Sequence, residues 1–306
     1  MFSEINPSIT VDDLRMDTDI TYFQAPAFGG LVTQDLKMTV VYHKLSDMNF
    51  NEENNGIAGV CDTWSRDAMP KLPAIVWLCG GGWILTNRNN YLPNLMPIAK
   101  SGYVLVTVDY QGNNEARFPS QIVQIKAAIR YLRANANKYH IDPDRIGIMG
   151  ESAGGYYSYM VGVTGSTKEF DVGPNLEFPS NVQAVCPWYG PAECSLEEYC
   201  GIKYHHYLKL GGEISLESEL AKRANPKSYL HNGMPPFLIL HGEQDRFVPY
   251  WRSEEMYDAL LGYNTDVSLV KIKGADHADV RFFQPEVMDI IIAFFDRTLK
   301  NADINK

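Results

Sequence analysis

The sequence predicts an α/β protein with a mostly parallel sheet, helices on both faces of the sheet and a small cap insertion. Short apolar runs rich in β-branched residues alternate with helical patterns along most of the chain, as in sheets whose parallel strands are joined by helices. The 306 residues suffice for one large sheet or about two average domains. Residues with chemical function follow several of the apolar runs, at the edge where parallel sheets bind ligands.

Six apolar runs are predicted to be the parallel strands. They are Ala74–Cys79, Tyr103–Asp109, Arg145–Met149, Val182–Cys186, Phe237–His241 and Val267–Ile272. Helices are predicted after Pro119 and after Pro285, because apolar residues then recur at helical spacing and proline suits a first turn. The earlier segments Asp17–Phe23 and Met38–Lys44 have no helical pattern between them, and we expect an antiparallel hairpin at the sheet edge.

Two segments interrupt this alternation. Residues 45–73 are polar and rich in Asn, Asp and Glu, which predicts a surface loop. Residues 190–232 are too many for a plain crossover between two strands, so we expect them to form a helix and a small cap over the site. The motifs of the candidate site extend from residue 79 to residue 277. Only a single sheet can bring them together in one place. We therefore predict a single domain over residues 1–306.

The charge balance argues against two classes of partner. The chain has 27 Lys and Arg against 37 Asp and Glu, a formal net charge of −10, so we expect neither nucleic acid nor an anionic membrane as a partner. No apolar run approaches the roughly 18 residues that span a bilayer. The first residues have no basic region followed by an apolar stretch, so we expect no secretory signal and a cytoplasmic location.

The cysteines predict reduced thiols. There are five, an odd number, and none forms a CxxC pair. The nearest approach to a metal cluster is Cys194, Cys200, His205 and His206, whose spacing matches no usual zinc module. We expect no bound metal.

A candidate nucleophile lies in the segment Gly150-Glu151-Ser152-Ala153-Gly154. This GxSxG pattern follows a predicted strand and precedes a helical pattern, the context of a nucleophile elbow. Glycines two positions on either side of the serine allow neighbouring backbones to approach a strained turn closely. A dinucleotide-binding loop is the alternative, but the spacing is not GxGxxG and the unit lies in the middle of the chain.

A serine nucleophile needs a base, and the base needs an orienting carboxylate. Asp245 follows the strand Phe237–His241, and His277 follows the strand Val267–Ile272. Glu243 is an alternative acid, although it lies nearer the strand. We expect Asp276 and Asp279, which flank the histidine, to be solvated or to stabilise the loop.

A glycine-rich turn can supply the donors for a developing oxyanion. The strand that ends at Cys79 leads into Gly80-Gly81-Gly82-Trp83, whose backbone N–H groups can face a substrate closely. Together with the N–H of Ala153, they would complete an oxyanion hole. The alternative is a phosphate-binding loop, but no Gly-Lys-Ser or Gly-Lys-Thr follows.

These segments resemble the α/β-hydrolase superfamily, and within it the esterases and lipases related to hormone-sensitive lipase. The chain is most similar to the bacterial bifunctional feruloyl and acetyl-xylan esterase type, from about residue 35 to about residue 300. The segments that carry the resemblance are Cys79-Gly80-Gly81-Gly82-Trp83, Asp109-Tyr110 with Glu115 to Ile122, Gly150 to Gly155, His241 to Asp245 with Val248-Pro249, and His277 with Phe282-Phe283.

The resemblance implies a role for each matching residue. Ser152 would be the nucleophile, His277 the general base and then acid, and Asp245 the orienting carboxylate. The oxyanion donors would be Gly81, Gly82 and Ala153. Trp83, Trp188 and Tyr189 could line the substrate pocket, although core packing would explain each equally well.

One position departs from the family pattern. The family usually has histidine where this chain has Cys79, which cannot make the same hydrogen bonds, so the support of the oxyanion turn is in question. Glu115 resembles a family carboxylate that braces this turn.

We therefore expect a serine carboxylic-ester hydrolase without cofactor or metal. Its substrate would be a small-molecule or oligosaccharide ester with an acetyl or hydroxycinnamoyl acyl group, and a homo-oligomer is possible. The glycine-rich turn also resembles that of kynurenine formamidases, so a formamidase or amidase with the same three residues is an alternative. A third hypothesis is a binding protein on a hydrolase scaffold, which the presence of Ser152, His277 and Asp245 disfavours.

Overall fold

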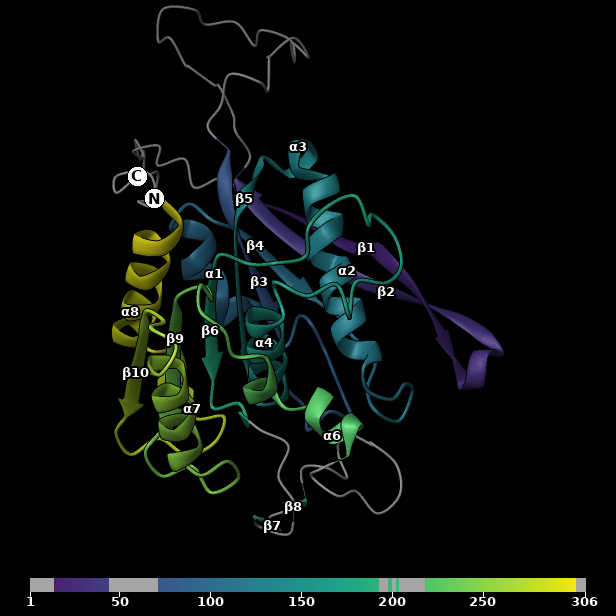
Figure 1. The fold of residues 1–306 in the computed structure, drawn as a ribbon. Helices are drawn as coiled ribbons and strands as arrows, with labels where there is room; N and C mark the ends of the chain where they lie inside the picture. The colour runs from purple at the N-terminus through teal and green to yellow at the C-terminus, as the bar shows by residue number, and fades with distance from the viewer. Residues whose placement is uncertain (1–13, 44–70, 193–197, 200–201, 204–217, 301–306) are drawn as a thin grey trace, which may run out of the picture.

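The computed structural model describes residues 14–43, 71–192, 198–199, 202–203 and 218–300. Residues 44–70, which make up most of the predicted surface loop, lie outside these ranges. The described residues form one layer of strands between two layers of helices (Figure 1).

The central sheet has eight strands in the order β1-β2-β4-β3-β5-β6-β9-β10. These strands are β1 (Leu14–Ala27), β2 (Val32–His43), β3 (Leu72–Leu78), β4 (Val104–Val108), β5 (Ile141–Glu151), β6 (Ala184–Trp188), β9 (Phe237–Gly242) and β10 (Val267–Ile272). The pairs β1/β2 and β2/β4 are antiparallel, and all other neighbours are parallel. The predicted fold class, the six parallel strands and the antiparallel edge hairpin are confirmed.

Helices cover both faces of the sheet. They are α1 (Leu92–Lys100), α2 (Ser120–Ala134), α3 (Ala136–Tyr139), α4 (Ala153–Val163), α6 (Glu219–Arg223), α7 (Trp251–Leu261) and α8 (Pro285–Phe295). Short helical turns lie at η1 (Phe28–Gly30), η3 (Pro226–Tyr229), η4 (Val280–Phe283) and η5 (Asp296–Lys300). Buried side chains of α2, α4 and α7 form one hydrophobic cluster, and those of α1 and α8 form another.

Strand β3 shows why its sequence is apolar at almost every position. Val76 and Leu78 belong to the cluster under α2, α4 and α7, whereas Ile75 and Trp77 belong to the cluster under α1 and α8. Alternate side chains of a strand point to opposite faces, so a strand covered on both sides is apolar throughout. The continuous apolar run in the sequence of β3 therefore indicates a central strand that is buried on both faces.

The predicted cap falls largely outside the described residues, as do Cys194, Cys200, His205 and His206. Its described parts include the two-stranded ribbon β7 (Glu198–Tyr199) and β8 (Ile202–Lys203), followed by α6 and η3. The segment around α6 is attached to the core, where the hydroxyl of Tyr156 in α4 donates to the carbonyl of Ala224 at 2.7 Å.

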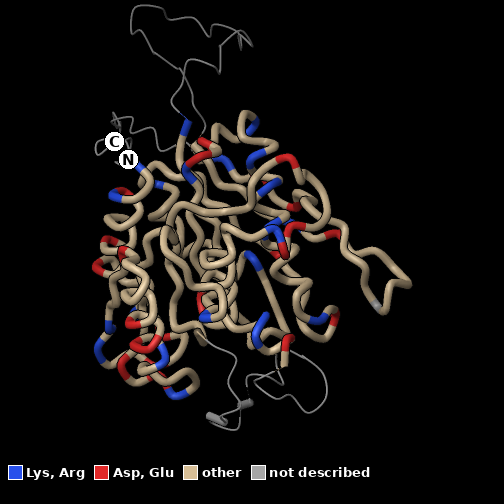
Figure 2. The backbone as a smooth tube through the Cα atoms, viewed as in Figure 1, with Lys and Arg blue, Asp and Glu red and all other residues tan. Residues whose placement is uncertain are grey.

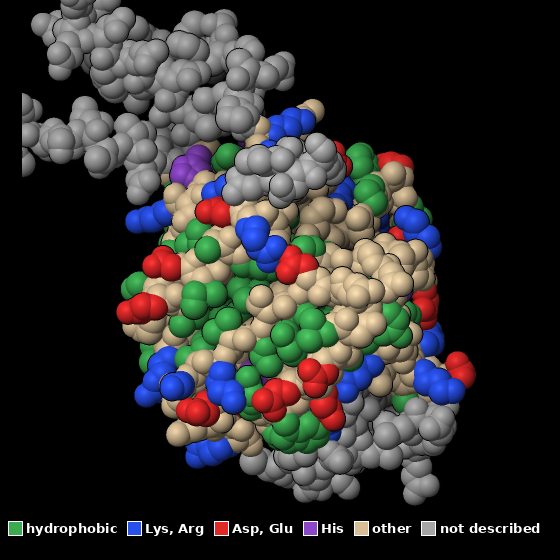
Figure 3. Space-filling view, turned by 60° about the vertical axis from the view of Figure 1, so that its left-hand side comes forward, with side chains coloured by type: hydrophobic (Ala, Val, Ile, Leu, Met, Phe, Trp, Pro, Cys, Tyr) green, Lys and Arg blue, Asp and Glu red, His purple; other side chains and the backbone are tan. Residues whose placement is uncertain are grey.

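The described surface carries charges of both signs. Figure 2 shows Lys and Arg interspersed with Asp and Glu around the outside of the molecule. On the side formed by the C-terminal elements, hydrophobic side chains gather in patches between charged ones (Figure 3), and exposed Val280 and Ile290 are among the large hydrophobic residues of the surface. None of the helices in the described ranges is long and apolar enough to cross a membrane. The expected homo-oligomer stays a prediction.

Candidate active site

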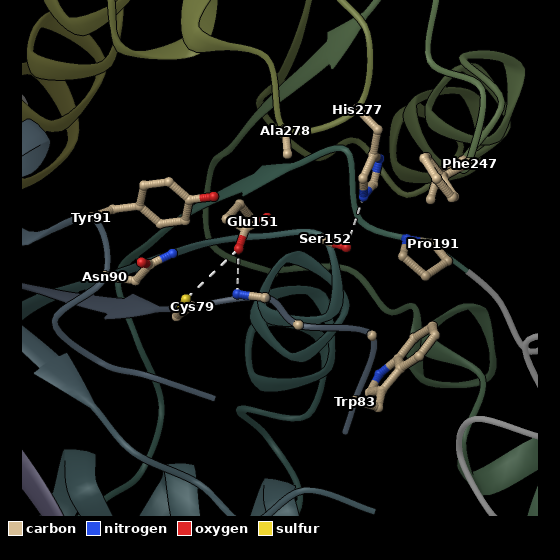
Figure 4. A pocket seen from close by; sticks show the side chains of 14 residues that line it. Cys79, Trp83, Asn90, Tyr91, Glu151, Ser152, Pro191, Phe247, His277 and Ala278 are labelled. Atoms are coloured by element: carbon tan, nitrogen blue, oxygen red, sulfur yellow. Dashed lines mark hydrogen bonds between the residues drawn. The ribbon is translucent and has the colours of Figure 1, made fainter. Parts of the chain in front are cut away.

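A cavity of about 440 Å³ lies at the carboxyl ends of the parallel strands. It contains Ser152 and His277 together with the glycine-rich turn after β3 (Figure 4). Its lining residues are Cys79, Gly80, Gly81, Gly82, Trp83, Asn90, Tyr91, Glu151, Ser152, Pro191, Phe247, Val248, His277 and Ala278. The segments that the sequence analysis singled out therefore meet in one place.

Ser152 occupies a strained turn between β5 and α4. Its φ of 54° and ψ of −118° are unusual for a residue other than glycine, and its N–H donates to the carbonyl of Trp188 at 3.0 Å. A Cβ on Gly154 would lie 2.1 Å from the carbonyl oxygen of Leu78, and a Cβ on Gly150 would lie 2.7 Å from the same atom. The two glycines are therefore required for close backbone approach, as predicted.

The structure brings Ser152, His277 and Asp245 into a hydrogen-bonded series. The Ser152 Oγ lies 2.9 Å from Nε2 of His277, and Nδ1 of His277 lies 2.8 Å from Oδ2 of Asp245. An ionised carboxylate can only accept, so Nδ1 carries the proton and Nε2 accepts from the serine hydroxyl. This arrangement leaves the base ready to remove a proton from Ser152.

The Asp245 carboxylate is held by four groups. Oδ1 accepts from the backbone N–H groups of Phe247 at 2.9 Å and Val248 at 2.8 Å, and Oδ2 lies 3.3 Å from Nε2 of His241 in addition to its bond from His277. Burial by itself would raise the pKa of Asp245, but hydrogen bonds from His241 and His277 outweigh it and lower the pKa to about 2. The carboxylate therefore stays ionised throughout the neutral range.

His241 is a positioning residue whose role the sequence analysis missed, because the histidine was considered as the end of a strand and the start of the segment His241 to Asp245. It is completely buried in β9. Its Nε2 lies 2.7 Å from the carbonyl oxygen of Val248 and its Nδ1 lies 2.6 Å from Oγ of Ser253. With acceptors facing Nε2, this nitrogen carries the hydrogen and Nδ1 accepts from the serine hydroxyl. His241 thereby ties the acid loop to α7.

The alternative carboxylates have other partners. Glu243 accepts from the N–H of Gly274 at 3.0 Å. Asp276 pairs with the side chain of Arg246, and Asp279 caps η4 by accepting from the N–H of Arg281. Among the described carboxylates, Asp245 is the one hydrogen-bonded to the His277 ring.

The turn after β3 exposes backbone donors beside Ser152. Gly81 and Gly82 have φ angles of 135° and 60°, which glycine adopts without a steric cost. No hydrogen bond within the described residues uses the N–H of Gly81 or Gly82. Ala153 is the first residue of α4, so its N–H is among the helix donors that have no intrahelical partner. These three groups are the candidates for an oxyanion hole.

Glu151 braces this turn from the neighbouring strand. Its Oε1 accepts from the N–H of Gly80 at 2.5 Å and lies 3.9 Å from Sγ of Cys79 (Figure 4). The hydroxyl of Tyr110 donates to the carbonyl of Cys79 at 2.5 Å. The turn is therefore supported even though Cys79 replaces the histidine usual in the family.

Glu115 does not contact the turn directly, contrary to what the resemblance implied. It accepts from the N–H of Gly112 at 3.0 Å, within its own loop. That loop reaches the glycine-rich turn through the N–H of Asn113, which donates to the carbonyl of Trp83 at 2.6 Å. The direct brace is Glu151, which the sequence analysis treated only as the second residue of GxSxG.

Burial perturbs both side chains of the Cys79 and Glu151 pair. Desolvation raises the pKa of Glu151 above its ordinary value, although the N–H of Gly80 opposes the shift. Desolvation, together with the nearby Glu151 carboxylate, raises the pKa of the Cys79 thiol to about 12. Cys79 is therefore a protonated thiol at neutral pH and a poor nucleophile.

Of the three aromatic residues predicted to line the pocket, the structure places only Trp83 in its wall. Trp188 and Tyr189 are fully buried and are absent from the lining. Trp188 ends β6, and its ring stacks on Phe282 at 5.7 Å. The Tyr189 ring packs edge-on against His277 at a centroid distance of 4.7 Å. The expectation was wrong for Trp188 because the strand extends two residues further than predicted. It was wrong for Tyr189, just after the strand, because Phe282 and His277 cover its ring.

Several lining residues were not predicted. Phe247 and Val248 lie two and three residues after Asp245, so their place in the acid loop was a signal that the sequence offered. Asn90 and Tyr91 lie just before α1, and Pro191 follows β6. Nothing local in the sequence distinguishes these three from ordinary loop residues.

The fold and the site together define an α/β-hydrolase. The BD-FAE family model matches residues 64–260, which is more than half of the chain. The chain therefore belongs to the BD-FAE family.

Curated relatives with esterase names share part of the chain. Esterase LipQ of Mycobacterium tuberculosis (strain ATCC 25618 / H37Rv) is 29% identical over 233 residues, covering 73% of this chain and 55% of the relative. The probable carboxylic ester hydrolase LipM of the same organism is 28% identical over 253 residues, covering 78% of this chain and 58% of the relative. The chain thus spans little more than half the length of these relatives.

Solved structures show the same fold. A truncated form of a carbohydrate esterase from gut microbiota has a TM-score of 0.74 at 23% identity, covering 94% of this chain and 96% of its own. A bifunctional GH43-CE protein of Bacteroides eggerthii has a TM-score of 0.73 at 26% identity, covering 93% of this chain and 35% of its own.

Proposed function

We propose that this chain is a serine carboxylic-ester hydrolase acting on acetyl or hydroxycinnamoyl esters of carbohydrates or small alcohols. The observation that carries the proposal is the hydrogen-bonded series of Ser152, His277 and Asp245 in a cavity lined by Gly81 and Gly82. The esterase names of LipQ and LipM support the reaction class, and the carbohydrate esterase among the structural neighbours supports a sugar ester.

Acylation follows from the geometry of the three side chains. Ser152 Oγ attacks the ester carbonyl carbon while its proton moves to Nε2 of His277. Asp245 accepts the hydrogen bond from Nδ1 and stabilises the imidazolium. The carbonyl oxygen becomes an oxyanion that the N–H groups of Gly81, Gly82 and Ala153 stabilise. His277 then gives its proton to the alcohol oxygen, the carbon–oxygen bond breaks, and the alcohol leaves.

Deacylation repeats the same steps with water. His277 removes a proton from a water molecule, whose oxygen attacks the acyl carbon attached to Ser152. The tetrahedral intermediate collapses, Ser152 leaves as an alkoxide that takes the proton from His277, and the carboxylic acid is released. The chemistry uses only side-chain and backbone groups of this chain, so neither a metal nor an organic cofactor is part of the proposal.

The proposal is tested by replacing the nucleophile. Ser152→Ala should lower kcat for p-nitrophenyl acetate by on the order of a million-fold, the usual effect of losing a nucleophile of this kind. A fluorophosphonate probe should label the wild-type chain at Ser152 and leave the variant unlabelled. Near-normal hydrolysis by a folded Ser152→Ala variant would refute the assignment.

A formamidase would use the same three side chains, so substrates must separate the two activities. Measuring kcat/KM for N-formylkynurenine and for acetyl esters compares the two directly. We expect the acetyl esters to be preferred, and a clear preference for the formamide would replace the proposed substrate class.

A further inference from the structure

The two ends of the cavity differ in chemistry. Ser152 lies between them in Figure 4, with Asn90, Tyr91 and Glu151 on one side and Trp83, Pro191 and Phe247 on the other. An ester has an acyl arm and an alcohol arm, and a cavity that bound two apolar arms would need no polar groups at either end. The polar end is therefore a feature to explain beyond the reaction itself.

The polar groups at this end are available to a ligand. The Tyr91 hydroxyl and the Asn90 side-chain amide point toward Glu151 in Figure 4. Neither side chain forms a hydrogen bond to another described residue. Since Asn90 and Tyr91 line the cavity, a bound molecule can supply their partners.

Glu151 adds an acceptor to the same end. Its carboxylate receives the N–H of Gly80, has a weak contact with the Cys79 thiol and lies near the Tyr189 hydroxyl. A carboxylate has about four acceptor positions in total, so at least one remains for a ligand. The side chain is only 4% exposed, so few water molecules can occupy the positions that remain. A donor from a ligand would therefore improve the solvation of this carboxylate.

The Tyr91 ring is fixed before any ligand binds. It stacks on Phe283 with a centroid distance of 4.9 Å and an interplanar angle of 24°, and it meets Trp77 edge-on at 6.1 Å. A side chain whose ring is already packed loses little rotamer freedom when its hydroxyl forms a hydrogen bond. The hydroxyl is thus held in place as a recognition group.

We propose that Asn90, Tyr91 and Glu151 form a subsite for a neutral hydroxyl group carried by one arm of the ester, an inference that rests on the proposed ester hydrolysis. A hydroxyl both donates and accepts, so it can donate to Glu151 and accept from Tyr91 or Asn90. A carboxylate would meet the Glu151 charge. An ammonium could donate to all three side chains, because a tyrosine hydroxyl and an asparagine amide accept as well as donate, but the esters of the proposed function are neutral. The substrate class is therefore hydroxylated esters.

The hydroxyl can belong to the acyl arm or to the alcohol arm, and matched ester pairs distinguish the two. For the acyl arm, methyl 3-hydroxybutyrate is compared with methyl butyrate. For the alcohol arm, 2-hydroxyethyl acetate is compared with ethyl acetate. We expect the wild-type chain to prefer the hydroxylated member of one pair by about tenfold in kcat/KM, because a site with buried polar groups discriminates against a ligand that leaves them unpaired.

Tyr91→Phe removes the hydroxyl and keeps the stacked ring, so it is the diagnostic variant. We expect it to reduce the preference for the hydroxylated ester by roughly fivefold to tenfold, the effect of one hydrogen bond, and Asn90→Ala to reduce it as well. Tyr263→Phe is the matched control, since Tyr263 is 39% exposed and does not line the cavity. Thermal unfolding of each variant shows that it is folded.

Two results would overturn the subsite while leaving the proposed function intact. One is equal hydrolysis of both members in both pairs by the wild-type chain. The other is a preference that persists unchanged in Tyr91→Phe and Asn90→Ala. A wild-type chain that hydrolyses none of the four esters and does not hydrolyse p-nitrophenyl acetate would instead overturn both the proposed function and this inference.

Discussion

The nucleophile elbow at Ser152 and the glycine-rich turn after β3 are neighbouring strained turns that are held in different ways. The elbow is fixed by backbone packing, because Gly150 and Gly154 allow close approach to the backbone of Leu78. The turn combines a close approach of Gly81 to the carbonyl oxygen of Leu85 with hydrogen bonds from distant side chains. Glu151 accepts from Gly80, and Tyr110 donates to the Cys79 carbonyl.

The difference explains why one turn was interpreted correctly from the sequence and the other only in part. Glycine spacing is local, so GxSxG reports the elbow directly. The glycines of the turn indicate an exposed backbone and, at Gly81, a close approach to Leu85. They do not reveal the side-chain braces, which come from β5 and from the residues after β4. Substitutions in both turns test this contrast.

Gly154→Ala should have the largest effect on stability. Its Cβ would lie 2.1 Å from the carbonyl oxygen of Leu78, and both groups belong to buried backbone. We expect a loss of at least about 3 kcal/mol in the free energy of unfolding, the upper part of the range for overpacking. Urea unfolding of the variant and the wild type measures the difference.

Gly82→Ala is the control for this prediction. Its Cβ would meet no atom within 4 Å, although its φ of 60° disfavours alanine. We expect a cost of about 1 kcal/mol. Equal destabilisation by the two substitutions would show that the contact with the Leu78 carbonyl is not what makes Gly154 necessary.

Glu151→Leu should have the next largest effect, on catalysis. Without an acceptor for the N–H of Gly80, the turn loses its brace, and we expect kcat for p-nitrophenyl acetate to fall by about 100-fold with little change in KM. Oxyanion donors act mainly in the transition state, and the loss of one typically costs about this much. Glu151→Gln keeps an acceptor oxygen and should retain at least about a tenth of the activity. A proportional rise in KM in Glu151→Leu would contradict a positioning role.

Cys79→Ala should have the smallest effect. The thiol lies 3.9 Å from Glu151, a weak contact, while Glu151 and Tyr110 hold the backbone on either side of it. We expect kcat/KM to change by less than about threefold, since thiols are weak hydrogen-bond donors. A loss comparable to that of Glu151→Leu would show that the sulfur itself supports the turn.

The fold was predictable because strand and helix patterns follow local rules. The alternation of apolar runs and helical periods located all six parallel strands, with boundary differences of a few residues. One such difference had a consequence, because Trp188 ends β6 and is buried with Tyr189 instead of lining the pocket. Trp188 lies inside the strand and points into a packed layer, whereas Tyr189 just after it is covered by Phe282 and His277.

The sequence by itself determined the α/β fold and the positions of Ser152, Asp245 and His277, because each follows a recognisable strand and parallel strands end at a common edge. The tertiary structure decided which side chains support them. In the register of β3 and β5, Leu78 pairs with Gly150, so the next residues, Cys79 and Glu151, lie side by side. Contacts between residues so distant in sequence depend on strand register and packing, which no local pattern encodes.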